Sequence, residues 1–174
     1  MTNTATSPTI PPRPRYYDDA VRETAVDGIL EDVCEWLQDN AQFEESRVRE
    51  ALLRCLDTNG YEYAQNLARR HGWAPDARLV EILDGLSLDA AHRKACIDWV
   101  KAHDVKVPFE VGALVSTVRY AKAKIFAIEE KYGWLIVQDD AWTHGDGGHI
   151  INFEDAIPII GTIDDAAPAE GGAA

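Results

Sequence analysis

The residue pattern of this chain changes from helical to strand-like at Asp104, which fixes the order of two structural parts. Between Tyr17 and His103, apolar residues recur at intervals of three and four, the spacing of one face of an α-helix. After Asp104, β-branched and aromatic residues occur in runs of about five with glycine-containing turns between them. We therefore predict an α+β fold, in which an N-terminal five-helix bundle precedes a C-terminal antiparallel β-barrel.

Capping residues and glycines predict where the helices begin and end. The expected start signals are Asp18 or Asp19, Ser46, Pro75 and Ser87, and the expected stop signals are Asn59-Gly60, Gly72 and Gly85. The apolar stripe of the first helix is predicted to be Val21, Ala25, Ile29, Val33, Trp36 and Leu37. Such a stripe requires neighbouring helices to cover it, so these segments should pack together.

The second part contains short runs that are typical of strands. These runs are Ala113–Val118, Ala123–Ile128, Trp134–Gln138, His149–Phe153 and Ile157–Ile160. Residues 109–160 resemble an SH3-like barrel, the class that includes KOW and Tudor modules. Residues 109–115 are similar to its opening strand, residues 123–137 to its central hairpin, and residues 152–159 to a helical turn before the last strand. The resemblance implies the barrel shape and carries no ligand with it, because Lys122-Ala123 replaces the usual KOW glycine.

Composition divides the chain into four segments. We expect a disordered proline-rich arm at residues 1–15, an acidic helical domain at 16–104, the SH3-like barrel at 107–160 and a disordered tail at 161–174. The arm ends in Pro11-Pro12-Arg13-Pro14-Arg15, a PxxP spacing that aromatic grooves can bind.

The chain has 174 residues and a formal net charge of −13, which disfavours nucleic acid and anionic lipid as partners and favours basic ones. Its cysteines, Cys34, Cys55 and Cys96, have no CxxC spacing, so we expect reduced, packed thiols. The N-terminus lacks the features of a signal peptide, and the apolar runs are too short to span a bilayer. We expect a cytoplasmic, non-enzymatic protein without a cofactor.

A row of acidic residues along the first helix is the main functional signal. Glu23, Asp27, Glu31, Glu35 and Asp39 recur every fourth residue, and no Lys or Arg occurs between Glu23 and Ser46. Like charges four residues apart on a helix repel by roughly 0.2–0.5 kcal/mol per pair. We therefore expect the row, with Trp142 as a second contact, to bind a basic protein surface.

The sharper form of this hypothesis is a regulator or inhibitor that mimics nucleic acid for a nucleic-acid-binding protein, as proteins of phages and plasmids do. The alternative reading of the row is a solvated helix face, because acids are favoured near a helix N-terminus and improve solubility.

Two other functions are open at this stage. A nucleic-acid-associated adapter would use the basic residues Arg119, Lys122, Lys124 and Lys131, which lie near Tyr120 and Tyr132. A metal-dependent enzyme would use the glycine-rich loop that holds His144, Asp146 and His149. His92, Cys96, Trp99 and His103 also share a helix face, but no further pair with metal-ligand spacing accompanies them.

Overall fold

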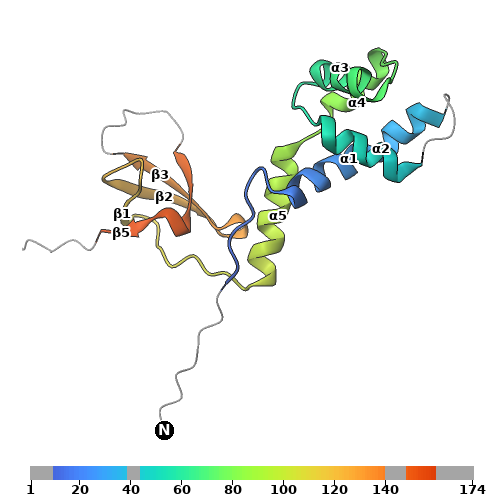
Figure 1. The fold of residues 1–174 in the computed structure, drawn as a ribbon. Coiled ribbons are helices and arrows are strands. Elements are labelled where there is room, and N and C mark those ends of the chain that lie inside the picture. Colours follow the sequence, from blue (N-terminus) through green and yellow to red (C-terminus); the bar gives the residue numbers. More distant parts are fainter. Residues whose placement is uncertain (1–9, 39–43, 140–147, 160–174) are drawn as a thin grey trace, which may run out of the picture. The chain divides into compact units, whose positions relative to one another are not determined.

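The computed structural model describes residues 10–38, 44–139 and 148–159. The chain divides into two compact units, Met1–Val105 and Lys106–Ala174, and each is described by itself. Unit 1 contains helices and unit 2 contains an antiparallel sheet (Figure 1). The predicted mixture of helices followed by antiparallel strands is therefore confirmed. Among the described helices, none combines the length and the apolar character needed to cross a membrane.

Unit 1 places two apolar clusters along its first helix. Its helices are α1 (Asp19–Gln38), α2 (Glu45–Cys55), α3 (Gly60–His71), α4 (Ala77–Asp84) and α5 (Leu88–Ala102). The larger cluster joins α1, α2, α3 and α4 around fully buried residues such as Leu52, Tyr63 and Leu67. The smaller cluster joins the start of α1 to α5 through Val21 and Leu88. A single five-helix bundle is therefore not confirmed, because α5 lies outside the larger core.

The predicted apolar stripe of the first helix is confirmed, because all of its members are buried. The stripe is Val21, Ala25, Ile29, Val33, Trp36 and Leu37. Full burial of a large aliphatic side chain contributes about 1.5–3 kcal/mol. The outer positions of α1 carry the acidic residues, which are exposed.

Asn59-Gly60 starts a helix, and the prediction that it ends one is wrong. Asn59 is the N-cap of α3, and its side chain accepts a hydrogen bond from the Glu62 N–H at 3.0 Å. The Gly60 N–H donates to the Asp84 carboxylate at 2.7 Å, which ties the start of α3 to the end of α4. A Cβ at Gly60 would lie 2.6 Å from the Val80 carbonyl oxygen, so this close approach requires glycine.

The other caps divide into confirmed and corrected predictions. Ser87 caps α5 through the Ala90 N–H, and Gly72 ends α3 in the left-handed conformation, as predicted. Ser46 does not cap α2, because α2 begins at Glu45 after Glu44, which makes no side-chain capping bond. Pro75 precedes α4, whose cap is Asp76.

Residues 10–15 of the arm are described, and they contact α5. The Trp99 indole N–H donates to the Pro11 carbonyl, and His92 forms a hydrogen bond with the Pro14 carbonyl. This packed segment differs from the disordered arm that composition predicts for residues 1–15, because proline content does not show whether an aromatic partner lies nearby. The rest of that arm and the predicted tail at 161–174 lie outside the described residues.

Unit 2 is an antiparallel sheet in the order β4-β3-β2-β1-β5. Its strands are β1 (Leu114–Ser116), β2 (Ala123–Glu129), β3 (Trp134–Asp139), β4 (His149–Asn152) and β5 (Ile157–Pro158). The short helical turns are η1 (Glu130–Tyr132), between β2 and β3, and η2 (Phe153–Asp155), before β5. β4 and β5 are the edges of this sheet, so a closed barrel is not confirmed.

Alternation along the strands gives the sheet one buried face. Ile125 pairs with Val137, Ile128 pairs with Leu135, and Val115 pairs with Ala123. All of these except Ile128 are fully or almost fully buried. The pairing shifts between Ile125 and Ala127, which marks a bulge where the Phe126 side chain is exposed.

Substitution of Tyr63 tests how much its buried hydrogen bond stabilises the larger core. Its hydroxyl donates to the Leu52 carbonyl at 2.7 Å, and its side chain is fully buried. Tyr63→Phe should lower the free energy of unfolding by about 1 kcal/mol, because a buried carbonyl loses this partner. Urea unfolding at neutral pH measures the change, and a stability equal to that of the wild type would contradict it.

Ionisation of Tyr63 should also make the free energy of unfolding depend on pH in the alkaline range. Burial raises the pKa of the Tyr63 phenol above its ordinary value of about 10. Since the folded-state pKa is the higher one, the stability linked to Tyr63 is complete below about pH 10 and is lost as the pH rises further. Tyr63→Phe should therefore lose less stability than the wild type as the pH rises above about 10, as measured by urea unfolding at each pH.

Candidate functional site

The acidic row lies on the exposed side of α1, where the helix period places it. Glu23, Asp27, Glu31 and Glu35 are all exposed, and Asp39 lies outside the described residues. Large apolar residues between them, among them Val26, Ile29 and Val33, are buried. The sequence therefore predicted correctly that these four carboxylates face away from the core.

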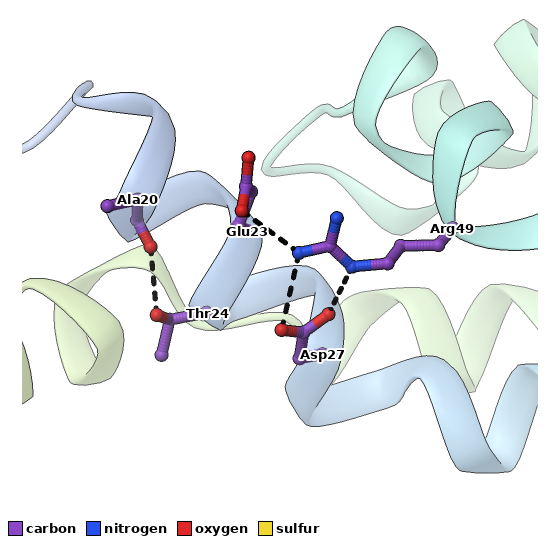
Figure 2. Close-up of polar contacts among 5 residues, drawn as sticks. All are labelled: Ala20, Glu23, Thr24, Asp27 and Arg49. Carbon is purple, nitrogen blue, oxygen red and sulfur yellow. Dashed lines mark hydrogen bonds and ion pairs between the residues drawn. The ribbon is translucent and has the colours of Figure 1, made fainter. Parts of the chain in front are cut away.

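Arg49 of α2 neutralises the first half of the row. Its Nε atom lies 2.7 Å from Asp27 Oδ1, and its Nη2 atom lies 3.1 Å from Glu23 Oε2 (Figure 2). The hydrogen bonds that Arg49 donates to Asp27, and then to Glu23, raise the pKa of Arg49 above its already high ordinary value. The premise that no cation of the chain compensates this row is therefore wrong for Glu23 and Asp27.

Sequence spacing alone did not reveal this ion pair. Arg49 follows Asp27 by 22 residues, so the two meet only because α2 packs against α1. The available signal was the position of Arg49 on α2, one residue after the buried Val48. A basic residue at the border of an apolar stripe is well placed to reach the neighbouring helix.

The second half of the row borders a groove between α1 and α2. We call it the acidic groove, a cavity of about 750 Å³ lined by Asp27, Leu30, Glu31, Cys34, Glu35, Glu45 and Arg49. Arg49, the one cation among these lining residues, is already bound to Asp27. Within the described part of the chain, no ion pair or hydrogen bond joins Glu31 or Glu35 to another side chain.

Cys34 is an uncharged residue in the lining of the acidic groove. Partial burial, and then the negative charge of Glu45, raise the pKa of the Cys34 thiol. A thiol with a raised pKa stays protonated at neutral pH and is a poor nucleophile. The groove therefore combines carboxylates, the apolar Leu30 and an unreactive thiol, a set that suits binding of a cationic group better than covalent catalysis.

The basic residues predicted for nucleic-acid binding do not form one cluster. Arg119 and Lys122 precede β2, Lys124 lies on β2, and Lys131 lies in η1 at the far end of that strand. A strand of seven residues is about 23 Å long. Lys131 also lies 4.7 Å from the Tyr132 ring centroid, a cation–π contact within its own turn.

Of the three residues predicted to bind a metal, the structure describes only His149. His149 begins β4, and its ring centroid lies 5.1 Å from that of Tyr120. His144, Asp146 and Trp142 lie outside the described residues. Among the residues that the structure does describe, no group of three or more His, Cys, Asp or Glu side chains is arranged to hold a metal ion.

Comparisons with known proteins identify no relative of this chain. No family model matches the chain, and neither a curated protein nor a solved structure matches it. The acidic groove must therefore be interpreted from its own residues.

Removal of the Arg49 guanidinium tests whether it joins the two helices. Arg49→Gln should lower the melting temperature at low salt, because Glu23 and Asp27 would repel without a bridging cation. Arg47→Gln is the control, since Arg47 lies on the same helix and, among the described residues, pairs at the surface with its neighbour Glu44.

The drop in melting temperature should be at least twice as large for Arg49→Gln as for Arg47→Gln, and high salt should reduce the difference by screening. Calorimetry at two salt concentrations measures both effects. Equal drops for the two variants would show that Arg49 does not hold α2 to the acidic row.

Proposed function

We propose that this chain is a non-enzymatic regulator or inhibitor that binds a basic segment of another protein in the acidic groove. The observation that carries this proposal is the presence of Glu31 and Glu35, exposed and without ion pairs in the described structure, beside a cavity of about 750 Å³. The neighbouring pair of Glu23 and Asp27 is already bound to Arg49.

The chemistry of the groove fits a lysine or arginine side chain. The aliphatic stem of either residue can pack on Leu30 and Cys34 while its charged end meets the carboxylates. A bound cation would also relieve the repulsion between Glu31 and its neighbours one turn away, Asp27 and Glu35. Exposed carboxylates on a chain of net charge −13 would raise the association rate with a basic partner at low salt.

The nucleic-acid mimic of phage or plasmid type is the sharper form of this proposal, and it requires a long row of free carboxylates. Arg49 shortens that row by two residues, so the contacts favour recognition of a short basic protein segment. Asp39 and Trp142, the other residues predicted for this interface, lie outside the described residues.

An SH3-like identity for unit 2 is also a proposal. Two features support it: β5 pairs with β1, and the helical turn η2 comes directly before β5. The nucleic-acid adapter has less support, because the basic residues lie at both ends of β2.

Charge reversal in the acidic groove tests the binding function. The double variant Glu31→Lys and Glu35→Lys should bind a fluorescein-labelled peptide of alternating lysine and serine at least fivefold more weakly than the wild type, because it places two cations at the groove. Fluorescence anisotropy at low salt measures the affinity.

The matched control is the double variant Glu81→Lys and Glu110→Lys. Both positions are exposed and lie outside the groove. Each double variant replaces two acids by two lysines, so the net charge changes from −13 to −9 in both cases. If the control variant loses affinity as much as the groove variant, attraction is set by total charge and the groove is not the site.

A further inference from the structure

One face of α5 binds the proline-rich arm of the same unit. His92, Cys96 and Trp99 occur at the first, fifth and eighth positions of a helical face, which places them in one line. The Trp99 indole N–H donates to the Pro11 carbonyl at 3.0 Å, and the His92 Nε2 atom lies 3.2 Å from the Pro14 carbonyl oxygen. Two carbonyls of one short segment are therefore bound by two aromatic side chains.

Arg13 adds a charged contact between these two hydrogen bonds. Its guanidinium carbon lies 4.7 Å from the centroid of the Trp99 ring, within the range of a cation–π interaction. The Tyr16 ring meets the His92 ring edge-on at 5.6 Å between centroids. The arm thus contacts α5 through its proline carbonyls, through its arginine and through the tyrosine that follows.

The chemistry of these contacts is that of proline-segment recognition. Proline has no backbone N–H and a fixed φ, so the carbonyls of a proline-rich segment are free for outside donors and the segment loses little entropy when it binds. Aromatic grooves use this property to bind such segments. In this arm, Arg13 adds a cation that lies over the Trp99 indole ring.

With the arm in place, Trp99 is only 8 % exposed and Cys96 is fully buried. A turn aims the arm at this face, since the Arg15 N–H donates to the Asp18 carboxylate at 2.7 Å and the Asp18 N–H donates to the Arg15 carbonyl at 3.1 Å. If the arm left, the Trp99 indole N–H would lose its hydrogen bond to the Pro11 carbonyl, and the ring would lose the cover that the arm gives it.

We propose that the α5 face formed by His92, Cys96 and Trp99 is a binding site for proline-rich, arginine-containing segments, and that Pro11–Pro14 is its resident ligand. The same site accepts a separate segment of this type when the arm is released. This site is distinct from the acidic groove, and its test does not depend on the binding function proposed for that groove.

The tether determines how strongly the resident arm competes. A short linker gives an effective concentration on the order of millimolar. If the segment binds with a dissociation constant on the order of 0.1 mM, the arm weakens binding of a free competitor by about tenfold. A free peptide should therefore bind poorly to the wild type and well to a chain with a weakened arm.

The experiment uses the full chain with the arm substitutions Pro11→Gly, Arg13→Ala and Pro14→Gly. The probe is a fluorescein-labelled peptide with the sequence of residues 9–16, and anisotropy measures its binding. The peptide should bind the arm variant at least about tenfold more tightly than the wild type. Adding Trp99→Phe to the arm variant keeps a ring but removes the N–H donor. The peptide should bind this combined variant about tenfold more weakly than it binds the arm variant.

A peptide of the same charge with all its prolines replaced by alanine is the control for attraction to an acidic protein. Equal binding of this control peptide, equal binding by the wild type and the arm variant, or no binding to the arm variant at millimolar peptide would each overturn the proposal.

Trypsin cleavage after Arg15 gives a second test that needs only one surface substitution. Arg13→Ala should speed this cleavage at least fivefold relative to the wild type, because release of the arm exposes the bond to the protease. An unchanged cleavage rate would show that Arg13 does not hold the arm on α5.

Discussion

The ion pairs of Arg49 with Glu23 and Asp27 are the constraint on which the functional interpretation depends. They join α2 to α1, and they neutralise the first two acids of the row. What α1 offers to other molecules is therefore set by packing between helices as well as by its own sequence. Within the row, the described carboxylates left for a partner are Glu31 and Glu35, which share a groove with Glu45 of α2.

A second constraint comes from the way α5 is covered. The larger core ends with α4, and α5 packs on the start of α1 through the small cluster around Val21 and Leu88. The next part of α5 meets the proline-rich arm, which binds Trp99 and His92. Unit 1 therefore carries two different recognition chemistries, an acidic groove for cations and an aromatic face for proline carbonyls. They lie on different helices and can be tested separately.

The sequence predicted most of the secondary structure, since buried stripes and caps are local properties. The stripe of α1, the cap of α5 at Ser87 and the left-handed Gly72 follow from spacing and residue type. The wrong predictions concern positions whose structure depends on residues far away in the sequence. Gly60 starts α3 because Asp84 and Val80 of α4 approach its backbone, and Arg49 reaches Asp27 across the helix interface. The arm was also predicted from composition alone, which cannot show that Trp99 binds it.

Cross-linking to a recovered partner tests whether Glu31 and Glu35 receive positive charge from another molecule. A protein captured on the full chain at low salt would be treated with a zero-length carboxylate-to-amine cross-linker and analysed by mass spectrometry. We expect cross-links from Glu31, Glu35 or Glu45 to lysines of the partner, and we expect them to be lost at high salt. Cross-links confined to carboxylates of unit 2, or to those of α3 and α4, would contradict it.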